Sequence, residues 1–170
     1  MKRPTTRIGY GFDSHEFRPG IPLKIGGIAI PHELGLGGHS DGDVLLHALT
    51  DALLGAVSAP DIGALFPPSD PRWKSADSAL FLREALKRVR RAGYRVANTD
   101  ASLILAAPRI GPHAATIRDH VAELLGVPLD CVGLKAKTPE GLNLSNAAVA
   151  QVVVLLEKVE SSKKPRRKTK

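Results

Sequence analysis

The run Arg7-Ile8-Gly9-Tyr10-Gly11-Phe12-Asp13-Ser14-His15 predicts the first strand of the fold and ends in two side chains that can bind metal. A strand directs alternate side chains to the same side of a sheet, so Asp13 and His15 point to one face. Both can therefore bind the same ion. We expect the strand itself to span residues 7–12, with the polar residues at its end.

A second polar run, His39-Ser40-Asp41-Gly42-Asp43, opens the first predicted helix. Ser40 is the expected N-cap, and Asp43 three residues later completes an approximate capping box before the apolar run 44–57. On this helix Asp43, His47 and Asp51 lie on one stripe, because each follows the last by four residues. We expect one of the three to face the first strand.

Asp13, His15 and His47 together offer one carboxylate and two imidazoles. Three protein ligands leave a coordination position open for water or substrate, whereas structural zinc sites use four. Cys131 is the sole cysteine, so neither a Cys-x-x-Cys zinc module nor a disulfide framework is present. Charged groups beside apolar segments are costly to bury without a partner, which favours a metal. The alternative is that Asp13 caps a turn and His47 is a hydrogen-bonded core histidine.

The composition indicates one globular domain, residues 1–160, followed by a basic tail, residues 161–170. The tail holds six of the 24 basic residues; the 18 that remain face 17 acidic ones, so the net charge of +7 belongs mainly to the tail. A polar tail of this kind is expected to be disordered and to aid solubility. We therefore do not expect nucleic acid as a partner.

The chain shows neither an apolar stretch of about 18 residues nor an N-terminal signal with an apolar segment, so we expect a cytoplasmic protein without a membrane partner. Its pattern predicts a single-domain two-layer α/β sandwich, a mixed sheet with helices on one face. Strand 152–156 is apolar on both faces, so it is either central in the monomer or covered by partner subunits. The remaining elements are a hairpin at 23–30, a glycine-rich loop at 35–38, a loop with four prolines at 60–71, helices at 77–92 and 112–125, and strands at 96–105, 132–137 and 148–159.

Four runs, at 7–15, 39–43, 47–55 and 61–67, closely resemble the 2-C-methyl-D-erythritol 2,4-cyclodiphosphate synthase family, and the match runs in order from about residue 7 to 159. The resemblance implies a homotrimer with active sites between adjacent subunits. It implies that the 2-phosphate of 4-diphosphocytidyl-2-C-methyl-D-erythritol 2-phosphate attacks the β-phosphate, which closes the 2,4-cyclodiphosphate and releases CMP. This activity is that of a phosphorus-oxygen lyase in the non-mevalonate isoprenoid (MEP) pathway.

The resemblance also assigns site residues. A tightly bound divalent ion, expected to be Zn²⁺, would lie on Asp13, His15 and His47, and a second one, Mg²⁺ or Mn²⁺, on Glu140 with the substrate. His39 and Thr138 would position phosphate in the transition state, and Glu140 completes the catalytic set. Substrate contacts are implied for Asp13, His15, His39, Ser40, Asp61, Ile62, Gly63, Phe66, Pro67, Pro68, Ser69, Asp70, Ala107, Pro108, Arg109, Ile110, Gly111, Ala136, Lys137, Thr138, Pro139, Glu140 and Leu144.

Taken without the resemblance, several of these residues have simpler explanations. Asp61 fits a helix cap or an Asx turn, Thr138 a turn residue before proline, and Arg109 a solvated surface charge. The chain also departs from the family after Glu140. Many members carry Gly-Phe-Thr-Gly-Arg-Gly-Glu-Gly there, whereas residues 143–150 read Asn-Leu-Ser-Asn-Ala-Ala-Val-Ala, with Ala147 at the arginine position. A phosphate contact by that arginine is not expected here.

Two other functions fit the bare metal pattern. One is a metal-stabilised binding protein whose basic tail engages RNA or acidic lipid; it would need a fourth ligand, for which His39, Asp43 and Asp51 are candidates. A metal-dependent hydrolase would use the same three ligands with a bound hydroxide, because the ligand set does not specify the electrophile.

Overall fold

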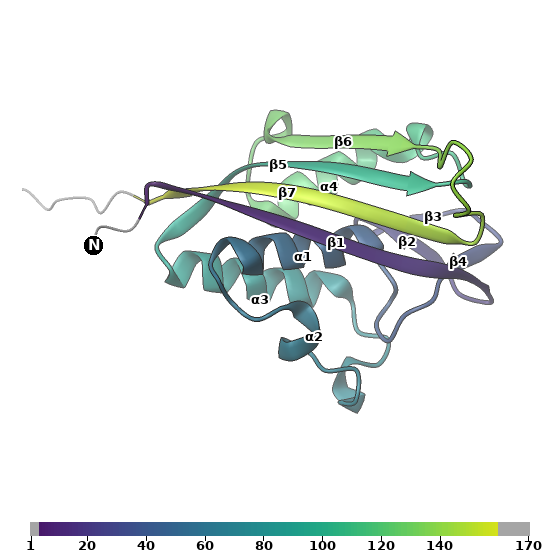
Figure 1. The fold of residues 1–170 in the computed structure, drawn as a ribbon, viewed down its shortest axis with the longest axis horizontal. Coiled ribbons are helices and arrows are strands. Elements are labelled where there is room, and N and C mark those ends of the chain that lie inside the picture. The colour runs from purple at the N-terminus through teal and green to yellow at the C-terminus, as the bar shows by residue number, and fades with distance from the viewer. Residues whose placement is uncertain (1–3, 160–170) are drawn as a thin grey trace, which may run out of the picture.

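The computed structural model describes residues 4–159; the basic tail 161–170 lies outside them. A five-stranded mixed sheet has the order β4-β1-β7-β5-β6, with only β5 and β6 parallel, and a separate hairpin pairs β2 with β3. The helices lie on one face of the sheet (Figure 1). The strands are β1 (Thr6–Pro19), β2 (Leu23–Ile25), β3 (Ile28–Ile30), β4 (Leu34–Leu36), β5 (Tyr94–Leu105), β6 (Val132–Lys137) and β7 (Ala147–Lys158), and the helices are α1 (Val44–Ala56), α2 (Ile62–Leu65), α3 (Ser78–Arg91) and α4 (Ala114–Leu125), with 3₁₀ turns at Pro71–Trp73, Gly111–His113 and Leu129–Cys131.

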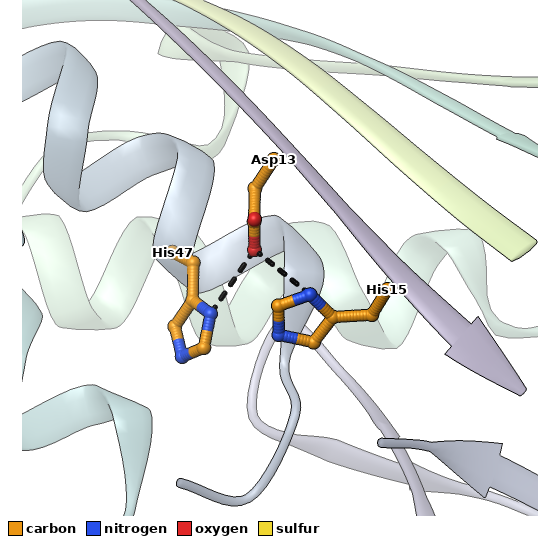
Figure 2. A group of neighbouring side chains, drawn as sticks. All are labelled: Asp13, His15 and His47. Carbon is orange, nitrogen blue, oxygen red and sulfur yellow. Dashed lines mark hydrogen bonds and ion pairs between the residues drawn. The ribbon is translucent and has the colours of Figure 1, made fainter. Parts of the chain in front are cut away.

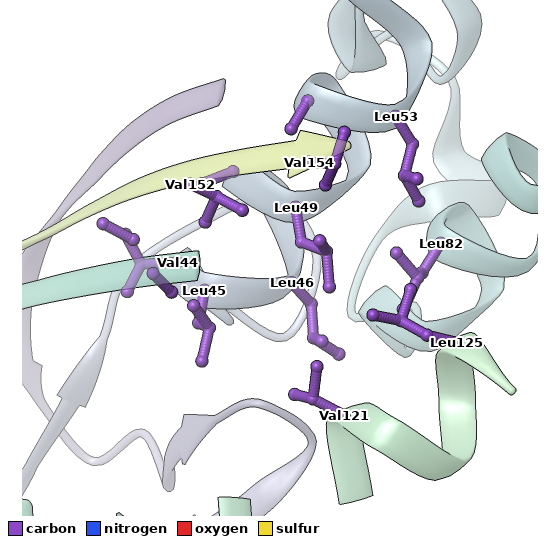
Figure 3. Close-up of a cluster of buried hydrophobic side chains, with 14 of the residues drawn as sticks. Val44, Leu45, Leu46, Leu49, Leu53, Leu82, Val121, Leu125, Val152 and Val154 are labelled. Atoms are coloured by element: carbon purple, nitrogen blue, oxygen red, sulfur yellow. The ribbon is translucent and has the colours of Figure 1, made fainter. Parts of the chain in front are cut away.

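Helix α1 is the central element of the core. It contacts β1, β7 and α3, and its Leu45 and Leu49 line a small space together with Ile117 and Val121 of α4, which is why it is apolar on nearly all sides (Figure 3). Ten of its 13 residues are buried. The residues that meet around it in Figure 3 include Val44, Leu45, Leu46, Leu49, Leu53, Leu82, Val121, Leu125, Val152 and Val154.

Two glycines of β1 bring this helix unusually close to the strand. A Cβ atom at Gly9 would lie 1.8 Å from the carbonyl oxygen of Ala52, and one at Gly11 would lie 1.8 Å from that of Ala48. Only glycine therefore permits the contact. The close packing places the side chain of His47, the residue before Ala48, beside Asp13, so the glycines in the first strand help to build the site.

Most elements were predicted correctly from the sequence, including the hairpin and the helices α3 and α4; in the structure Asp77 is the N-cap of α3 and Gly126 ends α4. The predicted N-cap Ser40 is wrong: Asp43 caps α1 and accepts from the Leu46 N–H. Strand β1 continues to Pro19, so the Asp13-Ser14-His15 run lies within the strand rather than at its end. Strand β4, helix α2 and the 3₁₀ turns were not predicted.

The outer face of the sheet exposes apolar side chains on β1 and β7, whereas β5 and β6 carry the exposed ion pair of Asp100 and Lys135 there. Strand β7 is central, yet its alternate residues behave differently: Val152 and Val154 are buried under the helices, whereas Val153 is 45% exposed. Ile8, Tyr10 and Phe12 extend this surface on β1, with exposed fractions of 71%, 57% and 51%. None of the helices within residues 4–159 is long and apolar enough to cross a membrane.

Asp43 joins α1 to the hairpin from a fully buried position. Its carboxylate accepts from the N–H groups of Gly26 (2.9 Å), Gly27 (2.6 Å) and Leu46 (3.0 Å). Burial raises the pKa of this carboxyl, while the three donors act in the opposite direction.

We expect Asp43→Ala to lower the free energy of unfolding by about 3 kcal/mol, because it leaves two buried N–H groups and a partly buried one without an acceptor. Urea denaturation of the metal-free protein measures the change. Asp130→Ala, at an exposed residue of a 3₁₀ turn, is the control and should have little effect. Equal stability of the Asp43 and Asp130 variants would contradict this account.

Candidate metal centre and its cleft

Two elements bring one carboxylate and two imidazoles together. Asp13 and His15 project from β1 on its helix-facing side, and His47 projects from α1 toward them (Figure 2). Oδ2 of Asp13 lies 3.0 Å from Nδ1 of His47 and 3.5 Å from Nδ1 of His15. One ligand atom from each residue lies within 4.8 Å of the others, so the cluster could hold one divalent metal ion.

The hydrogen bonds of the two histidines fit this use. His15 donates from Nδ1 to the carbonyl of Ser14 at 2.7 Å, which leaves Nε2 with a lone pair. This Nε2 is buried and has no hydrogen-bond partner among residues 4–159, as expected for an atom that binds a metal. His47 uses its other nitrogen, Nε2, for protein contacts with the hydroxyls of Ser40 and Ser78, both at 2.9 Å.

A cleft of about 220 Å³ opens directly above these three side chains. One side of the cleft is formed by the polar loop before α1. The other side is aromatic: Phe66, Trp73 and Phe81 pack together with ring centroid distances of 4.5 to 5.9 Å. The residues that line the cleft are Asp13, His15, Gly38, His39, Ser40, His47, Ile62, Gly63, Phe66, Pro68, Trp73 and Phe81. Nine of these were candidates from the sequence; Gly38, Trp73 and Phe81 were not.

The loop beside the cleft is held by carboxylates. Asp51 on α1 accepts from the Ile62 N–H at 2.8 Å, and burial raises the pKa of Asp51. Asp61 caps the short α2 through the Ala64 N–H at 2.7 Å, which is the simpler function considered for it. Further along, the Arg72 guanidinium lowers the pKa of Asp70. Pro67, Ser69 and Asp70 lie on this loop but outside the cleft lining.

Asp43, His47 and Asp51 do share a helix, yet only His47 enters the cluster. Asp43 turns to the hairpin and Asp51 to the Ile62 loop. His39 reaches across the cleft mouth, where its Nε2 is 3.4 Å from the Asp70 carbonyl oxygen.

The other candidate residues lie toward the β6 edge of the sheet, away from β1. Residues 107–111 follow β5, and residues 136–140 end β6 and enter the next loop. Asp13 is level with Ala136 across β7 and β5, which corresponds to about 14 Å at three strand spacings of about 4.8 Å. Thr138 donates a hydrogen bond to Glu140, whose φ is 46°.

Within the described residues, Glu140 is not part of the carboxylate and histidine cluster. Leu144 lies in the same loop, and Ala147 is the first residue of β7, paired with Glu16. The two groups of candidate residues, one around the metal centre and one after β5 and β6, therefore lie apart in a single chain.

The model of the YgbB family matches residues 6–157. The 2-C-methyl-D-erythritol 2,4-cyclodiphosphate synthase of Koribacter versatilis is 67% identical over 152 residues, which are 89% of this chain and 98% of that protein. A solved structure of a synthase of the same name covers 89% of this chain and all of its own, with 48% identity and a TM-score of 0.85. A CDP-bound structure of a synthase of that name shows 46% identity and a TM-score of 0.84 over the same shares.

Proposed function

This chain belongs to the YgbB family, and we propose that it makes 2-C-methyl-D-erythritol 2,4-cyclodiphosphate at the cleft above Asp13, His15 and His47. The reaction consumes 4-diphosphocytidyl-2-C-methyl-D-erythritol 2-phosphate and releases CMP, as a phosphorus-oxygen lyase of the non-mevalonate pathway, in the cytoplasm. The observation that carries the proposal is a three-residue cluster on an open cleft, in which the buried Nε2 of His15 has no hydrogen-bond partner among the described residues 4–159.

The reaction has an electrostatic problem, since an anionic 2-phosphate must approach an anionic β-phosphorus. A new P–O bond forms as the bond from the β-phosphorus to the CMP oxygen breaks. No general base is needed, because the second phosphate ionisation lies near pH 6 and the nucleophile is largely dianionic at neutral pH. The site must therefore supply positive charge and position the two groups in line.

Two divalent ions would supply that charge. Imidazole nitrogen and carboxylate oxygen suit Zn²⁺, which we assign to Asp13, His15 and His47, with its open position available to a β-phosphate oxygen. Glu140 would hold Mg²⁺ or Mn²⁺ together with substrate phosphates, since such ions commonly take only one or two carboxylates. His39 and Thr138 would position phosphate oxygens in the transition state.

The cleft accounts for the sugar end of the substrate. We assign the methylerythritol contacts to Asp61, Ile62 and Gly63 and to the segment 66–70, of which Ile62, Gly63, Phe66 and Pro68 line the cleft. Ser40, in the loop before α1, lines the cleft as well, and we assign it to the phosphate end of the substrate. The cytidine end would be held by residues 107–111 and 136–140 and by Leu144; solved relatives with bound CDP support a nucleotide ligand.

We propose a homotrimer in which the cytidine-binding loops of one chain complete the cleft of its neighbour. Two observations support this assembly. Asp13 and Ala136 are about 14 Å apart in one chain. The outer sheet face also exposes Ile8, Tyr10, Phe12 and Val153 side by side, an apolar surface that a partner would cover.

Val153→Asp should convert the trimer to monomers, because it places a charge on the central strand of that surface. Light scattering after size exclusion measures the mass. Activity should fall with it, whereas metal content should stay, since Asp13, His15 and His47 come from one chain. Leu80→Asp is the matched control: Leu80 is 48% exposed, but on α3 rather than the outer sheet face. A trimeric Val153→Asp protein would contradict the proposed interface.

Incubation with the phosphorylated cytidine substrate, followed by phosphorus NMR, tests the function. We expect CMP and the cyclic diphosphate in equal amounts. CMP without the cyclic product would indicate a metal-dependent hydrolase, and neither product would overturn the proposal.

A further inference from the structure

A series of polar contacts runs from the metal cluster through α1, α3 and the loop before α1 to β2. His47 of α1 contacts Ser78 at the start of α3, with 2.9 Å between Nε2 and Oγ. Ser78 donates its hydroxyl hydrogen to Oδ1 of Asp41. The other oxygen, Oδ2 of Asp41, accepts from Lys24 of β2 at 3.2 Å.

The direction of these hydrogen bonds is fixed by the number of protons available. The Asp41 carboxylate can only accept, and the hydroxyl of Ser78 has one hydrogen, which Asp41 takes. Toward His47, Ser78 can then only accept, so the proton of the neutral imidazole must be on Nε2. The lone pair is therefore on Nδ1, the nitrogen that lies 3.0 Å from Asp13 in the metal cluster.

Ser40 contacts the same Nε2 at 2.9 Å but cannot fix the tautomer by itself, since its hydroxyl is free to donate or accept. Ser78 differs because it is fully buried and its hydroxyl hydrogen is already donated to Asp41. Asp41 is itself held in place: its N–H donates to the Ala76 carbonyl at 3.1 Å, just before α3.

We propose that Ser78 is a positioning residue of the metal centre, which, with Asp41, holds His47 in the Nε2–H tautomer and presents Nδ1 to the ion. Outer partners of this kind commonly change metal affinity by about 10- to 100-fold. The inference rests on the proposed metal centre. Sequence alone could not identify Ser78, which is 31 residues from His47 and has no motif of its own.

We expect Ser78→Ala to weaken Zn²⁺ binding by about 10- to 100-fold in a competition titration with a chelating dye. The visible spectrum of the Co²⁺-loaded protein should change as well, because the coordinating ring loses its fixed orientation. Thr50→Val is the matched control: Thr50 is on α1, is fully buried and donates its hydroxyl to the Leu46 carbonyl at 2.7 Å. It loses a buried hydrogen bond of similar kind but should bind Zn²⁺ like the parent protein.

Asp41→Asn tests the next hydrogen bond in the series, from Ser78 to Asp41. The amide keeps the size of the carboxylate but can also donate, so the hydroxyl of Ser78 no longer has to donate to residue 41 and can donate to His47 instead. We expect Asp41→Asn to weaken Zn²⁺ binding in the parent protein and to have no further effect in the Ser78→Ala protein, because both act through one hydroxyl. Additive effects, or parent-like affinity of Ser78→Ala, would overturn the proposal.

A measurement on the unmodified chain covers the case in which Ser78→Ala fails to fold. Nitrogen-15 shifts of the His47 ring, assigned by comparison with His47→Gln, report the tautomer directly. The Nε2–H form is expected, and the Nδ1–H form would overturn the proposal. If the parent and His47→Ala proteins bind Zn²⁺ equally, the metal centre itself is wrong; if only His47→Ala loses the ion, the failure concerns Ser78 alone.

Discussion

His47→Ala protein should be purified without its divalent ion and should lose about a thousandfold in kcat. His47 is one of the three proposed ligands, and the two that remain, Asp13 and His15, would offer too few donors for tight zinc binding. The lost rate corresponds to about 4 kcal/mol, the scale expected when a Lewis acid no longer stabilises transition-state charge.

Metal analysis of the purified protein and steady-state kinetics measure the two effects. His120→Ala is the control, because His120 lies on α4, is partly exposed and is outside the cluster. It should keep both metal and turnover. Stoichiometric zinc in His47→Ala would show that the ion lies elsewhere, and normal turnover without metal would remove the ion from the mechanism.

The metal cluster could be predicted because it depends on short-range periodicity. Alternation along β1 places Asp13 and His15 on one side wherever the strand ends, so the prediction survived the error in the strand's length. The N-cap of α1 was predicted wrongly because it depends on the conformation of a single residue. Gly42 has a φ of 73°, which cannot continue into a helix, so the turn at 40–42 delays the start of α1 to Val44.

What sequence could not predict depends on packing between distant segments. Phe81 enters the cleft wall because α3 packs against α1, and Ser78 reaches His47 for the same reason. Trp73, at the end of the 3₁₀ turn before α3, enters the wall by packing against Phe81. The residues after β5 and β6 illustrate another limit: the family resemblance groups them with the metal centre, whereas one chain separates them. In the proposed trimer, a neighbouring subunit would bring its residues after β5 and β6 to the metal centre of this chain.

Glu140→Gln should lower kcat about a hundredfold, weaken activation by Mg²⁺ or Mn²⁺, and leave the tightly bound ion in place. Glutamine keeps the size and hydrogen bonding of Glu140 but removes the charge that would hold the second cation with the diphosphate. The fall should appear in kcat more than in KM, because charge on the departing CMP develops in the transition state.

Kinetics at increasing Mg²⁺, with zinc analysis of the same samples, measure the effect. Glu123→Gln is the control for an exposed glutamate, since the Glu123 side chain is 83% exposed on α4. Ala147→Arg, which restores the arginine common in the family, should improve turnover little if this chain already orders its phosphates without it.

Parent-like kcat and metal dependence of Glu140→Gln would contradict the assignment and direct attention to another carboxylate. Asp43 and Asp61 are the alternatives that the sequence offers. Asp43 is fully buried and engaged by three N–H groups, so it has no oxygen to spare for an ion at the cleft. Asp61 is exposed at the start of α2, beside the cleft-lining Ile62, and uses only Oδ1 in its cap. Asp61→Asn would therefore be the next variant, and loss of Mg²⁺ activation in it would place the second cation there.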